Sequence, residues 1–191
     1  LSLTSTGVAT AGRVTRTARI GQKGVTLLPL RERVEAIKAL GRKIVARAHL
    51  DSTEVPNGAM FHECRPDLVL IEAPDTSSSY GGLVERIQLY HEVTRLLVDN
   101  DIPFGIVPSP ILKGYATGNG GVDKGKKRVK AAVRELWPEY GEVNDDEADA
   151  IVLAAMAEDR LTGLRRVPAA QSLDWLNRPS IEWPTDLVWV P

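Results

Sequence analysis

Two short apolar runs separated by a helical pattern constrain the fold of this chain more than any other feature. The first run, residues 68–71 (LVLI), follows Pro66-Asp67, and the second lies within residues 103–107 (PFGIV). Continuous apolar runs of this length are typical of strands buried on both faces, as in parallel sheets. Between them, residues 83–98 predict a helix. The order strand, helix, strand predicts a sheet that helices cover.

A hairpin and three further helices are predicted around this unit. Residues 8–11 and 14–20 flank a turn at Gly12-Arg13 and alternate Val, Thr and Ala with Arg, which favours a β-hairpin. Residues 25–28 predict a third short strand, and residues 109–115 a brief helical turn. Further helices are predicted over residues 30–48, 123–137 and 145–161. The predicted fold class is mixed α/β: a central sheet made of a β-hairpin plus parallel strands, flanked by helices on both faces.

The composition bounds the class of protein. A chain of 191 residues, 43% hydrophobic and 26% charged, is long enough for one domain with a sizeable core. Cys64 is the only cysteine, which excludes an internal disulfide and fits a reducing cytoplasm. No apolar run approaches the roughly 18–20 residues of a membrane span, so we expect no membrane partner. The net charge of −1 means that nucleic-acid binding would need a local basic patch.

The C-terminal residues differ from the rest of the chain. Residues 164–191 hold four prolines and three of the four tryptophans, with weak periodicity. This change in composition predicts two parts, a domain over residues 1–163 and a Pro/Trp-rich arm over residues 164–191. We expect the arm to pack on the domain or on another subunit, in a structural role.

A cluster of acids opens the helix predicted over residues 145–161. Asp146 and Asp149 are three residues apart, so both carboxylates leave one face of the first turn. Asp149 has apolar neighbours, and two poorly solvated carboxylates repel each other unless a cation lies between them. Mg²⁺ and Mn²⁺ prefer such oxygen ligands. The alternative is ordinary helix capping, in which Asn144 or Asp145 is the N-cap and the acids favour the helix dipole.

A third acid, Glu72, directly follows the strand predicted over residues 68–71. Functional groups in α/β sheets gather at the carboxyl ends of strands, which is where a metal ligand would be expected. The alternative is a surface glutamate at the end of a strand.

A glycine-rich loop leads into a strongly basic helix. Lys113 and Lys124 bracket a segment that contains Gly118, Gly120 and Gly121. No acid interrupts the basic run after this loop, which consists of Lys124, Lys126, Lys127, Arg128, Lys130 and Arg134. Such a run predicts a surface that tracks phosphates, and the alternative is a solvated helix face. The loop is not a Walker motif, because the Gly-Lys-Ser/Thr ending is absent.

Four segments carry a joint pattern: LVLIE at 68–72, VPSPILK at 107–113, GNGGVDK at 118–124 and DEADA at 146–150. Their two lysines are eleven residues apart, and the last segment has the form Asp-x-x-Asp-Ala. Together they resemble the RuvC family of Holliday-junction resolvases, and the resemblance covers about residues 1–162. It implies the RNase H-like fold. The Pro/Trp-rich tail lies outside the resemblance and is typical of a phage version.

The resemblance implies a role for each matched residue. Glu72, Asp146 and Asp149 would ligate two divalent ions, Mg²⁺ or Mn²⁺, which activate water and stabilise the leaving 3′ oxygen. Lys113 and Lys124 would hold the scissile phosphate. The family acts as a homodimer that nicks four-way junctions in DNA recombination and repair, and forks and flaps are further candidate substrates. The residues expected to contact DNA are these two lysines together with Lys126, Lys127, Arg128, Lys130 and Tyr80.

Tyr80, in the loop after Glu72, is the candidate for an aromatic wedge at the crossover. The alternative for this residue is a partly exposed loop position without a function in DNA binding.

One part of the family pattern is absent from the sequence. In the family, a first strand ends in a catalytic Asp, and residues 1–9 match the segment that comes directly after that Asp. The first acid of this chain is Glu32, so no other carboxylate replaces it. Either the 191-residue form is truncated or the site is not intact, and we expect this form to bind metal weakly and to cut poorly.

Two alternatives to a junction-nicking endonuclease remain open. One is a non-catalytic protein on the same fold that binds branched DNA or has a structural role. The other is a different RNase H-like enzyme, such as a nuclease for RNA–DNA hybrids or a transposase core.

Overall fold

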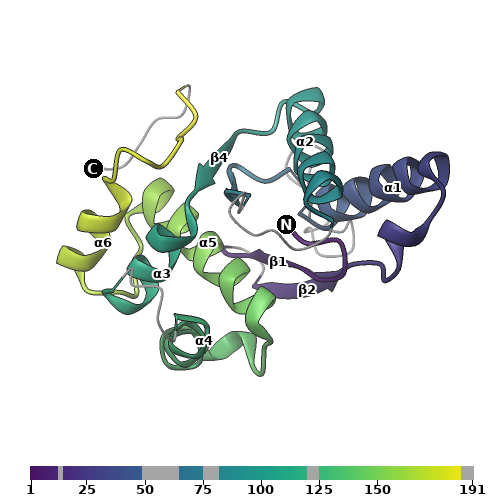
Figure 1. Ribbon diagram of the computed structural model, residues 1–191. Helices are drawn as coiled ribbons and strands as arrows, with labels where there is room; N and C mark the ends of the chain where they lie inside the picture. The colour runs from purple at the N-terminus through teal and green to yellow at the C-terminus, as the bar shows by residue number, and fades with distance from the viewer. Residues whose placement is uncertain (13–14, 49–64, 75–81, 120–124, 186–191) are drawn as a thin grey trace, which may run out of the picture.

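The computed structural model describes residues 1–12, 15–48, 65–74, 82–119 and 125–185 (Figure 1). The strands are β1 (Thr6–Thr10), β2 (Arg16–Ile20), β3 (Val69–Glu72) and β4 (Phe104–Val107). The α-helices are α1 (Leu30–Ala48), α2 (Leu83–Asp99), α3 (Ser109–Thr117), α4 (Gly125–Leu136), α5 (Asp145–Thr162) and α6 (Ala169–Leu176). Two short 3₁₀ helices are η1 (Val25–Leu27) and η3 (Pro138–Tyr140). No helix in these ranges is long and apolar enough to cross a membrane.

The strands form two separate pairs. β1 and β2 make an antiparallel hairpin in which Thr6 lies opposite Ile20, and β3 and β4 run parallel with Glu72 opposite Val107. Both pairings were predicted from the sequence. Among the described strands, however, no hydrogen-bonded ladder joins the hairpin to the parallel pair. The central sheet is therefore divided into two halves.

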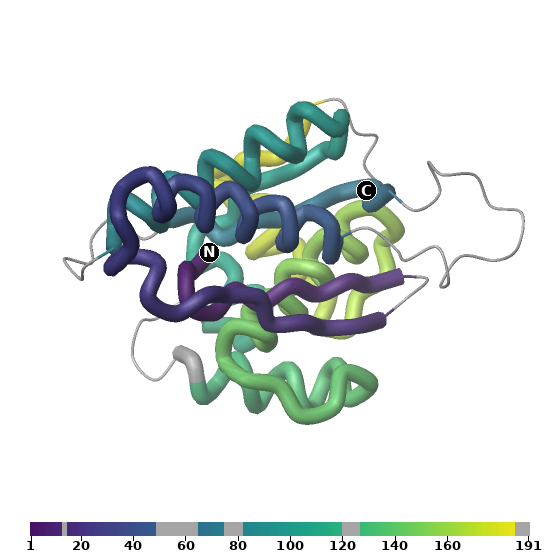
Figure 2. Tube along the Cα trace, turned by 90° about the vertical axis from the view of Figure 1, so that its right-hand side faces the viewer, coloured from purple at the N-terminus to yellow at the C-terminus, as the bar shows by residue number. Residues whose placement is uncertain are grey.

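Helices cover both faces of this divided sheet, as predicted (Figures 1 and 2). On one side, α1 and α2 bury a core that includes Leu40, Leu89 and Val93. On the other side, α3, α4 and α5 bury a second core that includes Leu112 and Ile151. The apolar stripe of each of these helices is buried in one of the two cores. The molecule is therefore a three-layer α/β structure.

Residues 25–28 are not a strand, which corrects the prediction for this segment. Gly24 has a φ of 76° and begins the 3₁₀ helix η1, in which the Leu27 N–H donates to the Gly24 carbonyl at 3.0 Å. Val25 is buried beside α1, while Leu27 is exposed. The strand propensity of Val, Thr and Leu is overridden because this turn must lead directly into α1.

One helix is longer than predicted, and another was not predicted at all. The brief turn expected at residues 109–115 is the full helix α3, which ends where Gly118 adopts a φ of 74°. The arm contains the eight-residue helix α6, which was not predicted from the sequence. The loop predicted after β3 and the start of the basic helix lie partly outside the described residues.

Candidate functional site

The first turn of α5 is capped by Asn144 and Glu147. The Asn144 Oδ1 accepts hydrogen bonds from the Asp146 N–H at 2.9 Å and the Glu147 N–H at 3.1 Å. The Glu147 Oε2 in turn accepts the Asn144 N–H at 3.0 Å, which completes a capping box. Capping therefore accounts for these two residues and does not account for the side chains of Asp146 and Asp149.

Strand β1 packs directly on this first turn. A Cβ atom built on Gly7 would lie only 1.9 Å from the Asp146 carbonyl oxygen, so the close approach requires glycine. Two residues earlier, the Ser5 hydroxyl donates to the Asp146 Oδ2. This hydrogen bond orients the Asp146 carboxylate. Sequence reasoning missed Ser5, and Gly7 within a strand is the signal that could have indicated this contact.

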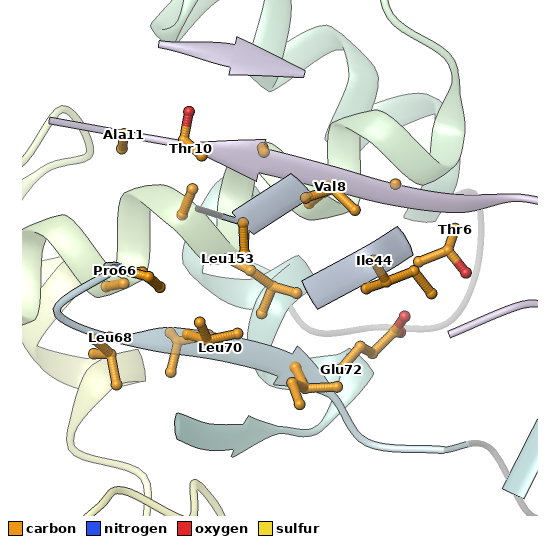
Figure 3. A pocket seen from close by; sticks show the side chains of 18 of the residues that line it. Thr6, Val8, Thr10, Ala11, Ile44, Pro66, Leu68, Leu70, Glu72 and Leu153 are labelled. Carbon is orange, nitrogen blue, oxygen red and sulfur yellow. The ribbon is translucent and has the colours of Figure 1, made fainter. Parts of the chain in front are cut away.

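A groove of about 680 Å³ separates the two halves of the sheet. Residues 5–12 line it from the β1 side and residues 65–72 from the β3 side. Figure 3 shows β1 and β3 running in opposite directions along it, with Leu153 and Ile44 between them. The middle of the groove is apolar, as the interior of a sheet would be.

The three predicted carboxylates line this one groove. Glu72 ends β3, while Asp146 and Asp149 come from the first turn of α5. In Figure 3, Glu72 lies at the same end of the groove as Thr6. The Ser2 N–H donates to the Thr6 Oγ1 at 2.9 Å, which holds the first residues of the chain at this end as well.

The carboxylates suit a divalent cation in their chemistry, since oxygen ligands are those that Mg²⁺ and Mn²⁺ prefer. They are not gathered into a formed site. Within the described ranges, no group of three or more His, Cys, Asp or Glu side chains is spaced to hold a metal ion. In the part of the chain that the structure describes, the donors are therefore right in kind but not closely spaced.

The predicted lysines are only partly described. Lys113 lies on α3 and is half-buried. Lys124 and Tyr80 fall outside the described residues, as does the side chain of Lys126. The structure therefore bears on Lys113 and leaves the other three as predictions.

Helix α4 is amphipathic and lies beside α5. Val129 and Val133 are fully buried in the core that α5 shares, whereas Lys127 and Arg128 are exposed. The Lys130 ammonium lies 3.8 Å from the Asp145 carboxylate, a surface pair that contributes little to stability. The basic face thus borders the acidic first turn of α5.

Comparison with known proteins identifies the class of fold. No family model and no curated protein matches the sequence. Among solved structures, the chain is similar to Thermus thermophilus RuvC in complex with a Holliday junction substrate, with a TM-score of 0.52 and 17% identity over 80% of this chain and 85% of that one. A second Thermus thermophilus RuvC structure matches with a TM-score of 0.48 and 16% identity, covering 78% of this chain and 82% of that one.

The chain accordingly has the mixed α/β, RNase H-like fold of the RuvC resolvases. At this level of identity the likeness concerns the fold, and the chemistry must be argued from the residues themselves.

Proposed function

We propose that this protein is a metal-dependent, structure-specific endonuclease that nicks branched DNA such as four-way junctions. One observation carries the proposal: carboxylates from two elements, Glu72 of β3 and Asp146 and Asp149 of α5, line a single groove. Helical capping, the main alternative for the acidic turn, is already satisfied by Asn144 and Glu147. The fold shared with RuvC supports the same class of reaction.

Each residue would have a distinct task. Glu72, Asp146 and Asp149 would hold Mg²⁺ or Mn²⁺, two ions in all, which when bound supply an activated water and stabilise the leaving 3′ oxygen. The Ser5 hydroxyl would keep the Asp146 carboxylate turned toward the groove. Lys113 and Lys124 would offset the negative charge that develops on the scissile phosphate.

The groove between β1 and β3 would accept one more extended strand. Because β1 and β3 run in opposite directions, such a strand could pair antiparallel with one and parallel with the other. A strand joined to Leu1 would run along the groove toward Glu72, since Leu1, Ser2 and Ser5 line the groove and Ser2 is hydrogen-bonded to Thr6 at that end. We infer that an Asp at the end of such a strand would supply a fourth carboxylate beside Glu72.

The partner in this proposal is branched DNA. The exposed Lys127 and Arg128 of α4 would contact its phosphates, and Lys126 and Lys130 would extend the same face. Tyr80 is retained as the candidate wedge at the crossover. A four-way junction has two-fold symmetry, which a homodimer matches, so that each subunit would nick one strand. The proposed location is the cytoplasm, which would be that of the bacterial host if the protein is phage-encoded.

The test compares two extended chains that differ in one residue. A five-residue apolar strand is joined to Leu1 through either Asp or Asn, and nicking of a labelled four-way junction is followed with Mg²⁺ and with chelator. We expect the Asp form to nick, and both the Asn form and Asp146→Asn in the Asp form to be at least about 100-fold slower. Full activity of the unextended chain would contradict the strand proposal.

A second candidate function is a non-catalytic protein that binds branched DNA. It is favoured by the lack of a formed three-acid metal group within the described residues. Tight junction binding by the Asp-extended chain, without nicking of four-way, forked, flap or hybrid substrates, would select it. Nicking of RNA–DNA hybrids alone would instead select a different RNase H-like enzyme.

A further inference from the structure

The described part of the C-terminal arm, residues 164–185, is built into the domain. Val167, Leu176 and Ile181 of the arm are buried in the same core as α3 and α5. Figure 1 shows α6 lying next to α3 on the side of the molecule away from α1. The function proposed above does not assign a role to this arm.

We propose that the arm is a positioning element for Lys113. It holds α3 in register against α5, which keeps the Lys113 side chain at a set place relative to the carboxylates of Asp146 and Asp149. This inference rests on the proposed function, because it assigns a partner element to one of its residues. Three separate contacts carry it.

The first contact is between Trp175 of α6 and the backbone of α3 at Gly114. A Cβ atom built on Gly114 would lie 2.3 Å from two atoms of the Trp175 indole, so the ring rests on the helix backbone where only glycine leaves room. Gly114 directly follows Lys113. The ring therefore sets how close α3 comes to the arm at the residue next to the lysine.

The second contact is a buried polar hub at Asp159, which is 2% exposed. Asp159 belongs to α5 and accepts a hydrogen bond from the Tyr115 hydroxyl of α3 at 3.1 Å. It also accepts one from the Ser172 hydroxyl of α6 and pairs with the Arg165 Nε at 3.2 Å. A carboxylate can be buried this deeply only when it is paired and hydrogen-bonded, so the three elements are bound in one arrangement.

The hub lies on the same helix as the metal-ligand candidates. Asp159 is ten residues after Asp149 on α5, which is about 15 Å along the helix axis. Tyr115 is two residues after Lys113 on α3. The hydrogen bond between Tyr115 and Asp159 therefore couples the helix that carries the lysine to the helix that carries the acids.

The third contact holds both ends of α3. The Gln171 side-chain amide donates to the Tyr115 carbonyl at 2.6 Å, in the last turn of the helix. Before the helix, Ile106 of β4 and Glu182 of the arm exchange two backbone hydrogen bonds, each 2.9 Å. The arm is thus hydrogen-bonded to β4, the strand before α3, and to the last turn of α3.

The test uses the Asp-extended chain and two measurements, the nicking rate constant at saturating junction and the Kd for the junction. Gly114→Ala inserts a methyl group into the space of the Trp175 ring. We expect it to lower the rate constant at least tenfold while Kd stays within twofold, because α3 shifts and the DNA surface of α4 does not. Adding Trp175→Leu makes room for the methyl group and should restore the rate constant to that of Trp175→Leu alone.

The matched control is Gly41→Ala in α1, where the added methyl group would lie 2.8 Å from the Glu92 Cγ and so crowds the packing of α1 on α2 instead of that of α3 on the arm. It should leave rate and Kd unchanged. If Gly114→Ala does not fold, Ser172→Ala, which removes one donor to Asp159, takes its place with the same expectation. Amide hydrogen exchange over residues 109–117 should quicken in each arm variant and not in the control.

The outcomes separate this inference from the proposed function. If the parent nicks the junction and the Gly114→Ala variant nicks it equally fast, the positioning role is overturned. Failure of Trp175→Leu to rescue the rate, or unchanged exchange over residues 109–117, overturns it as well. A parent that nicks no branched substrate overturns the proposed function, whatever the exchange over α3 shows.

Discussion

At the residue scale, the acids at the start of α5 divide into two groups with different tasks. Asn144 and Glu147 satisfy the backbone N–H groups of the first turn. The Asp146 carboxylate instead accepts a hydrogen bond from the Ser5 hydroxyl, and Asp146 lines the groove together with Asp149. A helix needs only one capping box, so capping does not explain why Asp146 and Asp149 line the groove.

This division predicts that substitutions in the two groups affect different properties, stability in one case and metal binding in the other. Asn144→Ala should lower the free energy of unfolding by about 1 kcal/mol, because the cap is removed. Asp146→Asn should lower it less, and should instead weaken Mn²⁺ binding by the Asp-extended chain. Urea unfolding and calorimetric titration with Mn²⁺ measure the two quantities. A stability loss as large for Asp146→Asn as for Asn144→Ala would argue that Asp146 serves the helix.

Lys113 is predicted to act on the rate of nicking more than on DNA binding. Lys113→Ala in the Asp-extended chain should slow nicking by about 10²–10³-fold, since it removes one donor to the developing charge. The Kd should change little, because many other phosphate contacts remain. Single-turnover nicking and fluorescence anisotropy separate the two, with Lys38→Ala on the exposed face of α1 as the control. Lys124→Ala should behave like Lys113→Ala.

At the scale of the element, α4 shows how one helix serves both core and surface. Its apolar stripe, with Val129 and Val133, is buried against α5, so Lys127 and Arg128 must face outward. The weak pair between Lys130 and Asp145 lies at the border with the acidic turn. The helix that anchors α5 therefore also carries the basic face.

We expect each exposed base of α4 to contribute to the salt dependence of junction binding. Lys127→Ala or Arg128→Ala should reduce the slope of log K against log salt by about one unit for each phosphate that the side chain neutralises. Lys126→Ala and Lys130→Ala are predicted to act in the same direction. Anisotropy titrations from low to moderate salt give the slope, and Lys38→Ala should leave it unchanged. A basic-face variant with the parental slope would place that residue away from DNA.

At the scale of the whole molecule, two tyrosine hydroxyls join segments that are distant in the sequence. The Tyr140 hydroxyl donates to the Thr10 carbonyl at 2.6 Å, which ties η3 to β1. Burial, followed by nearby carboxylates, raises the pKa of Tyr140 to about 12. Burial and then Asp159 raise the pKa of Tyr115 as well. Both phenols therefore favour the folded state in their neutral form.

The sign of this effect predicts a loss of stability at alkaline pH. Below about pH 10, the usual pKa of an unfolded tyrosine, the contribution is fully present, and it is lost as the pH rises through the folded value. The free energy of unfolding should fall between about pH 10 and 12. Urea unfolding at several pH values should show a shallower fall for Tyr140→Phe than for the parent. An equally steep fall in Tyr140→Phe would contradict the assignment.

The local elements were largely predictable from the sequence. Apolar periodicity and short buried runs located α1, α2, α5 and the strand pairs, because these patterns reflect burial on one or two faces. The 3₁₀ helix η1 was mistaken for a strand, since strand propensity depends on a neighbouring strand that the turn does not have. Helix α6 was missed although it is amphipathic, because it is only eight residues long and lies in a segment with four prolines.

The site divides in the same way between sequence and structure. Glu72, Asp146, Asp149 and Lys113 could be proposed from their positions at element ends and from the family resemblance. The contact of Ser5 with Asp146 could not, because it joins residues 141 positions apart. Neither could the contacts of Asp159, whose partners come from α3, from α6 and from the segment between α5 and α6.

The sequence by itself determined most of the strands and helices, and which residues have the chemistry to bind metal and phosphate. These properties are local, since they depend on spacing and residue type within one element. Only the tertiary structure decided that the acids of β3 and α5 share a groove. The tertiary structure also decided that the sheet is split and that the arm packs on α3. Each of these features depends on packing between segments that are distant in the sequence.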